Sequence, residues 1–172
     1  MNWFKKLTYF ILLFTLLGCS NMKIENFSNA KPEFNLMEFF EGKVHAWGIV
    51  EDRFGNIRRQ FTVDMTGVIK NETLTLEEDF VYADGEIDKR IWKFSKFDEK
   101  SYKGFANDII GEAVAKEQGN AFNMKYKMDL DLGFTELRVN FNDWMFRIDE
   151  STIINKATIN KFGINIATVT LF

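Results

Sequence analysis

From Lys43 onward, apolar and polar residues alternate with a period of two, and this alternation constrains the fold more than any other feature of the sequence. In the clearest run, every second residue is apolar: Phe122, Met124, Tyr126, Met128 and Leu130. Segments 61–65, 74–82 and 137–141 alternate in the same way. Because successive side chains of a strand point to opposite faces of a sheet, the pattern predicts strands with one buried face.

Short stretches with turn-forming residues separate these segments, at 54–56, 71–72, 84–85, 98–100, 118–120 and 132–133. Asp84-Gly85 predicts a two-residue type I′ hairpin, in which both central residues have positive φ. A hairpin centred there places Arg90 opposite Asp79, with Glu78 on the diagonal. The spacing of the turns predicts about nine or ten strands in roughly 130 residues.

A meander of this length must close on itself or stack in two layers, because open sheet edges expose unpaired backbone groups. The sequence therefore predicts an all-β fold, a single antiparallel up-and-down β-barrel of about 8–10 strands with an apolar interior. A β-sandwich is the alternative. Residues 32–42 predict one short helical turn before the first strand.

The N-terminus has the pattern of an exported protein. Lys5 and Lys6 precede an apolar run, 7–17, that is shorter than the roughly 20 residues needed to cross a membrane and is typical of a secretory signal. The run ends in Leu-Leu-Gly-Cys, at 16–19, which resembles the lipobox of bacterial lipoproteins. That resemblance implies cleavage after Gly18 and acyl chains on Cys19 that hold the protein in a membrane.

The same resemblance implies a location in the cell envelope. Many such lipoproteins stay at the inner membrane when Asp follows the cysteine, and Ser20 stands there instead, so we expect the outer membrane, facing the periplasm. The alternative is an ordinary signal peptide with a chance cysteine. The expected organisation is a signal peptide at 1–18, the lipidated Cys19 with a flexible tether at 19–34, and the barrel domain at 35–172.

Composition excludes several classes of function. The chain has 22 basic and 25 acidic residues, and loss of 1–18 brings the charge from −3 to −5, which argues against a nucleic acid partner. His45 and Cys19 are the only histidine and cysteine, so neither a zinc site of these residues nor an internal disulfide is predicted. No G-x-S-x-G motif occurs, and neither a cofactor nor a catalytic residue is assigned.

A few polar residues stand at positions where the alternation expects apolar ones. Glu78 lies between Leu76 and Phe80, and Arg90 shares a face with Trp92. One interpretation is rim charges or a bulge that shifts the alternation. The other is a buried Glu78–Arg90 pair inside the barrel, since unpaired buried charges are unfavourable.

Such a polar spot in an aromatic interior could hold the head of an amphipathic ligand. The aromatic residues either pack in the core or contact the ligand. Asn142-Asp143-Trp144 is expected to form a turn. The candidate ligand-binding residues are Glu78, Arg90, Trp92, Trp47, Tyr126, Asp143 and Trp144.

Four blocks of sequence, at 39–61, 74–94, 102–126 and 141–164, resemble in the same order a family of bacterial lipoproteins called domain of unknown function 3833. The family has no established activity, and the resemblance implies a lipocalin-like barrel. The chain departs from true lipocalins, because Gly42 and Trp47 are five residues apart and do not form their G-x-W signature.

We therefore expect an envelope lipoprotein that binds a lipid, fatty acid or other small apolar ligand, with the membrane as its partner through Cys19. One alternative is a structural or interaction protein with a filled barrel. Another is a lipid-modifying accessory enzyme with Asp108, Asp143 or Glu78 as acid or base. A membrane-embedded barrel is a fourth interpretation, for which the final strand, 164–172, offers only a weak lipid-facing side.

Overall fold

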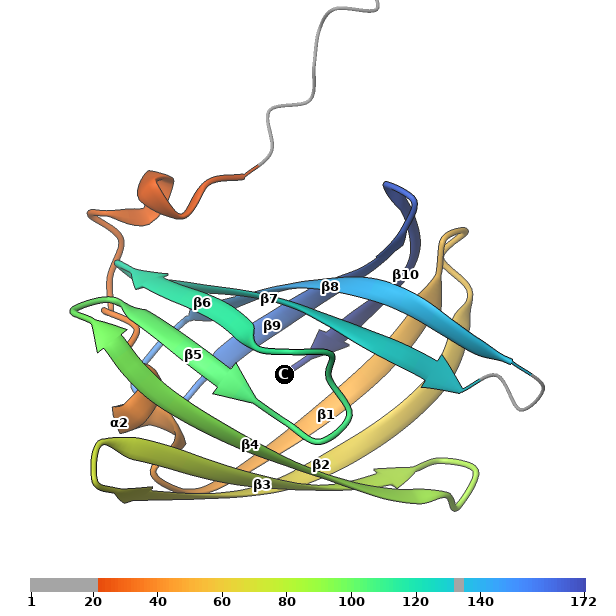
Figure 1. Cartoon of the computed structure of the whole chain (residues 1–172), viewed down its shortest axis with the longest axis horizontal. Helices are drawn as coiled ribbons and strands as arrows, with labels where there is room; N and C mark the ends of the chain where they lie inside the picture. The colour runs from red at the N-terminus through yellow and green to blue at the C-terminus, as the bar shows by residue number, and fades with distance from the viewer. Residues whose placement is uncertain (1–21, 132–134) are drawn as a thin grey trace, which may run out of the picture.

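The computed structural model describes residues 22–131 and 135–172, so the predicted signal peptide and Cys19 lie outside them. The described chain forms one closed antiparallel barrel in which each strand pairs with its neighbours in sequence and the last pairs with the first (Figure 1). The predicted up-and-down barrel is confirmed. The strands are β1 (Gly42–Asp52), β2 (Ile57–Lys70), β3 (Thr73–Tyr82), β4 (Ile87–Asp98), β5 (Ser101–Phe105), β6 (Ala113–Gln118), β7 (Ala121–Asp131), β8 (Glu136–Arg147), β9 (Ile153–Lys161) and β10 (Ile164–Leu171).

The period-two alternation places its apolar residues inside the barrel. On β7, Phe122, Met124 and Tyr126 are buried, whereas the intervening Lys125 and Lys127 are exposed. The other strands contribute inward residues at every second position, and these side chains form a single core. The barrel is held together by burial of this apolar inner face.

The hairpin between β3 and β4 differs from the predicted two-residue turn. Its loop is Ala83-Asp84-Gly85, closed by bonds from the Tyr82 N–H to the Glu86 carbonyl and from the Gly85 N–H to the Tyr82 carbonyl, both 2.9 Å. Gly85 has φ 88°, whereas Asp84 is not in the positive-φ region that a type I′ turn requires. The Asp84 carboxylate instead accepts a hydrogen bond from the Glu86 N–H at 3.1 Å.

The extra loop residue shifts the pairing by one position. Glu78 lies directly opposite Arg90, and Asp79 lies opposite Lys89, so the predicted register was wrong. Because directly opposed residues share a face, the observed register sends Glu78 and Arg90 together into the barrel.

The segment before β1 packs on the barrel. A 3₁₀ helix, η1 (Ile24–Phe27), brings the Phe27 ring to 5.8 Å from Trp144 and 5.4 Å from Phe146 on the outer wall. Phe34 is buried and stacks on Phe122 at 5.3 Å. The segment predicted as a tether therefore lies, from Met22 onward, partly against the wall.

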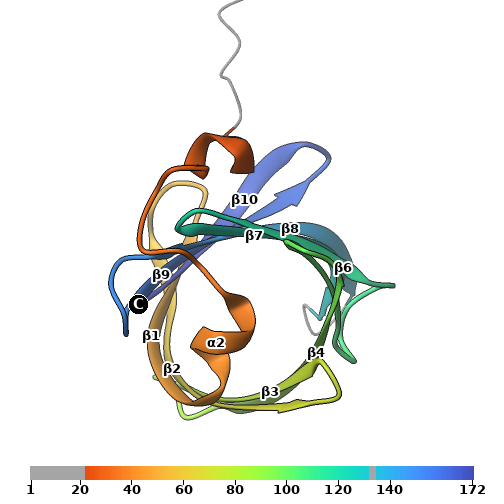
Figure 2. The same ribbon diagram turned by 90° about the vertical axis from the view of Figure 1, so that its left-hand side faces the viewer.

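The predicted helical turn is α2 (Leu36–Phe40), which sits within one end of the barrel (Figure 2). Asn35 caps it, because its side-chain oxygen accepts the Glu38 N–H at 3.2 Å. Leu36 and Phe40 are buried, and the Phe40 carbonyl lies against Gly67 of β2. Within residues 22–131 and 135–172, the structure has no helix long and apolar enough to span a membrane.

Gly67→Ala should destabilise the barrel by about 1–3 kcal/mol, the usual range for overpacking. A Cβ at this position would lie 1.7 Å from the Phe40 carbonyl oxygen, so either α2 or β2 must move. Urea unfolding followed by tryptophan fluorescence measures the change. Thr66→Ala, at the adjacent exposed position, should stay within about 0.5 kcal/mol of wild type, and equal stability of Gly67→Ala and wild type would contradict this packing of α2.

Candidate functional site

The inside of the barrel is not filled by side chains. A cavity of about 360 Å³ lies between the strands and α2, and aromatic, aliphatic and methionine side chains form most of its wall. Its lining includes the exposed residues Trp47 and Ser151 near the end that α2 occupies. The pairing of β1 with β10 starts at Trp47, which exchanges two backbone hydrogen bonds of 2.9 Å with Phe172, and the earlier residues of β1 pair with β2.

Two inward aromatic residues from the predicted set form part of this wall. Trp92 on β4 and Tyr126 on β7 are buried and meet edge to face at 5.3 Å. Phe141 on β8 stacks on Tyr126 at 4.7 Å. These contacts give the centre of the cavity a rigid aromatic side.

Charged side chains converge on the same part of the cavity. Glu78 of β3, Arg90 of β4 and Asp143 of β8 all line it. The Arg90 guanidinium binds Asp108, which lies in the loop between β5 and β6, with Nη2 at 2.6 Å and Nε at 2.7 Å from the same Oδ2. Glu78 and Arg90 face the cavity from directly opposed positions, as in the interpretation of a buried pair, but their side chains are not in ion-pair contact.

Asp143 is held by neutral donors. Its Oδ1 accepts the Asn155 side-chain amide at 2.7 Å, and its Oδ2 accepts the Tyr126 hydroxyl at 3.3 Å. Burial raises the pKa of Asp143, and these two hydrogen bonds only oppose the effect. Burial, followed by the nearby Asp143 charge, raises the pKa of Tyr126 well above its usual value.

The side chain of Glu78 is half-buried and faces the cavity. Burial raises the pKa of Glu78 to about 7, with Arg90 opposing the shift and the carboxylates of Asp143 and Asp108 adding to it. Glu78 therefore changes its charge near neutral pH. The three carboxyl groups named for the enzyme alternative surround one guanidinium.

The other two predicted residues lie on the outer face. Trp47 is 56% exposed, on the rim of the cavity, with its ring 4.6 Å from His45 and 6.5 Å from Phe172. Trp144 is buried between the outer wall and η1. The turn predicted at 142–144 is wrong, because these residues lie inside β8.

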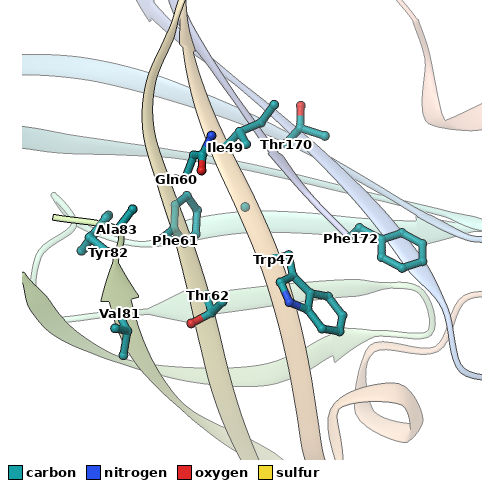
Figure 3. A pocket seen from close by; sticks show the side chains of 11 residues that line it. Trp47, Ile49, Gln60, Phe61, Thr62, Val81, Tyr82, Ala83, Thr170 and Phe172 are labelled. Atoms are coloured by element: carbon teal, nitrogen blue, oxygen red, sulfur yellow. The ribbon is translucent and has the colours of Figure 1, made fainter. Parts of the chain in front are cut away.

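Trp47 also borders a hollow of about 700 Å³ on the outer surface of β1, β2, β3 and β10 (Figure 3). Its described lining is apolar or neutral, with Ile49, Thr62 and Val81 among the residues shown. No charged group gathers in this hollow, and the polar chemistry lies within the barrel.

Glu117, a buried residue that sequence reasoning missed, holds α2 in place. Glu117 accepts the Leu36 N–H at 3.1 Å and the Tyr102 hydroxyl at 2.8 Å. A usable signal was present, because Glu117 shares its strand face with the buried Ala113 and Ala115.

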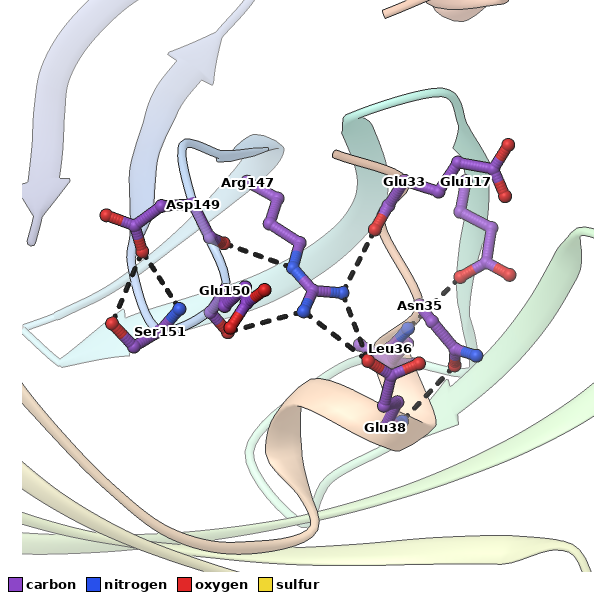
Figure 4. Close-up of polar contacts among 9 residues, drawn as sticks. All are labelled: Glu33, Asn35, Leu36, Glu38, Glu117, Arg147, Asp149, Glu150 and Ser151. Atoms are coloured by element: carbon purple, nitrogen blue, oxygen red, sulfur yellow. Dashed lines mark hydrogen bonds and ion pairs between the residues drawn. The ribbon is translucent and has the colours of Figure 1, made fainter. Parts of the chain in front are cut away.

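On the opposite side of α2, Arg147 ties three segments together (Figure 4). It donates to the carbonyls of Glu33, Asp149 and Glu150 at 3.0–3.3 Å and pairs with Glu38 at 3.3 Å. The helix at this end of the barrel is therefore fixed from both sides.

The chain belongs to the family described as protein of unknown function (DUF3833), whose family model matches residues 13–172. No curated protein and no solved structure matches the chain. The expected family is thereby confirmed. No group of three or more His, Cys, Asp or Glu residues suited to a metal ion occurs in the described parts of the chain.

The raised pKa of Glu78 predicts a pH-dependent stability. Between about pH 4.5 and pH 7 the folded carboxyl keeps a proton that the unfolded one has lost, so this group's contribution falls as pH rises through that window. From pH 5 to pH 8, wild type should lose about 1–3 kcal/mol more unfolding free energy than Glu78→Gln. Urea titrations at both pH values measure this, and parallel changes in the two proteins would contradict it.

Proposed function

We propose that the barrel binds one small amphipathic ligand of lipid-like character, with its apolar part against the aromatic wall and its polar head at Glu78, Arg90 and Asp143. The observation that carries this proposal is the convergence of three charged side chains on one part of a mainly apolar cavity. Ligand sites have this composition and volumes of roughly 300–1,000 Å³. The barrel fold is compatible with such a role.

The alternative of a purely structural protein with a filled barrel has less support. Ten strands enclose more space than the core side chains occupy, and a cavity of about 360 Å³ remains. A protein whose interior served only stability would gain by filling that volume with apolar side chains.

The proposal includes a location. Acyl chains on Cys19 would hold the barrel at the outer membrane, on its periplasmic side, where membrane lipids are the most abundant amphiphiles. The motivating observation is the Leu-Leu-Gly-Cys sequence after a short apolar run. Mass spectrometry of the N-terminal peptide from membrane fractions tests it, and an unmodified Cys19 would exclude the anchor.

A ligand should copurify with the domain that begins at Ser20, which contains every described element and the whole core. Val169→Phe places a ring in the cavity and should reduce the bound ligand at least tenfold, because it occupies the ligand's space. Native mass spectrometry of protein purified without detergent measures the loss. Thr168→Phe, which adds the same ring to the outer face next to it, is the control and should keep the ligand.

An empty wild-type domain, or equal occupancy in the two variants, would contradict binding inside the barrel.

The same measurement addresses the enzyme alternative, which gains some support from the carboxyl groups around Arg90. A bound ligand recovered with its mass unchanged after incubation favours a carrier, whereas a mass change that requires Glu78 or Asp143 favours catalysis.

A further inference from the structure

We infer that the head group of the ligand is a cation, an ammonium group held by Glu78 and Asp143, and that the cavity discriminates against a fatty-acid carboxylate. This inference rests on the proposed function, because it names the chemistry of the ligand in the same cavity.

The first observation is the balance of charge on the cavity wall. Among the described residues that line it, three carry carboxyl groups, Glu78, Asp88 and Asp143, whereas Arg90 is the one lysine or arginine and the single histidine, His45, is paired with Asp64 at 2.6 Å. Arg90 is already bound by Asp108 at 2.6 Å. A carboxylate head would therefore enter a site with an excess of negative groups, and like charges at close range repel.

The second observation is that neither inward carboxyl group is in ion-pair contact with a cation, although the charge of Arg90 acts on both from nearby. Asp143 is bound by the Asn155 amide and the Tyr126 hydroxyl, which are neutral donors. Glu78 faces the cavity without an ion pair, although Arg90 lies opposite it on β4. Two inward carboxylates near one guanidinium that Asp108 already binds are incompletely compensated, and an ammonium group between β3 and β8 would supply the missing positive charge.

The third observation is the aromatic surface beside these carboxyl groups. Trp92 and Tyr126 meet at 5.3 Å, and Phe141 stacks on Tyr126 at 4.7 Å. The negative faces of aromatic rings attract cations, and aromatic cages of this kind are where proteins bind alkylated ammonium groups. The apolar remainder of the cavity would take the ligand's hydrocarbon part.

The charge state of Glu78 adds a pH signature. Arg90 and Asp108 face Glu78 from β4 and the β5–β6 loop, and Asp143 and Tyr126 from β8 and β7. The titratable residues elsewhere in the cavity lining are His45, Tyr82 and Asp88. Because Glu78 loses its proton near pH 7, the affinity for an amine should rise about tenfold from pH 6 to pH 8. A carboxylate ligand would show the reverse trend.

Isothermal titration of the domain from Ser20 with dodecylamine, dodecanol and dodecanoate, below their micellar concentrations, tests the inference. Dodecylamine should bind at least tenfold more tightly than the other two at pH 8. Glu78→Gln should lower its affinity at least tenfold and remove the rise between pH 6 and pH 8. Glu77→Gln, the outward neighbour that pairs with Lys89, is the matched control and should bind as wild type.

The outcomes separate the two proposals. Dodecanoate or dodecanol binding as tightly as dodecylamine would overturn the cationic head and leave a ligand-binding barrel. Failure of all three probes to bind wild type, or equal binding to Val169→Phe, would overturn the cavity as a binding site and the inference with it. Circular dichroism establishes that each variant is folded, and Asp143→Asn, which should also weaken dodecylamine, provides a second test if Glu78→Gln unfolds.

Discussion

The pairing of β1 with β10 is the interaction on which the rest of the structure depends. It runs from Gly48↔Leu171 to Asp52↔Ala167 and turns a ten-stranded meander into a closed barrel. Without it, two edge strands would expose unpaired backbone groups and the inner face would be open to water. Because about eight strands already suffice for an interior filled by side chains, closure with ten leaves internal space that α2 only partly fills.

The charged side chains inside the barrel lower its stability and give the cavity its polar site. A core made only of the aromatic and aliphatic residues of the wall would be more stable than one that also holds Glu78, Arg90 and Asp143. Asp108 binds Arg90, and Asn155 and Tyr126 donate hydrogen bonds to Asp143. Glu78 has no such direct partner among them, and its charge changes with pH. Buried ionisable groups that are incompletely paired are typical of functional sites.

Much of the fold could be predicted because alternation and turn residues are local signals. The run from Phe122 to Leu130 shows directly which side of β7 is buried. The positions of Glu78 and Arg90 among apolar residues indicated an inward location as one of two interpretations, the other being rim charges or a bulge. The exact register of β3 and β4 could not be predicted, because it depends on whether the loop has two or three residues. That choice depended on whether Asp84 adopts positive φ. One residue of difference decides which side chains share a face.

Contacts between segments that are distant in the sequence could not be predicted from the alternation or from turn residues. Asp108 binds Arg90 from a loop eighteen positions away, and no periodicity connects the two. Trp144 faces outward yet is buried, because Phe27 covers it. Alternation distinguishes the faces of a strand only where one face meets water, and η1 removes that contrast along part of β8.

The packing of the N-terminal segment has a mechanical consequence. Between Met22 and α2, the chain is fastened first at Phe27 on the outer wall and then at Phe34, whose N–H bonds the Gly119 carbonyl at 2.6 Å. A pull on the N-terminus is therefore borne by η1 and then by Phe34 before any load reaches Leu36. Under tension the contacts of Phe27 with the outer wall would break before those of Phe34, so α2 would keep its place inside the barrel after η1 had detached.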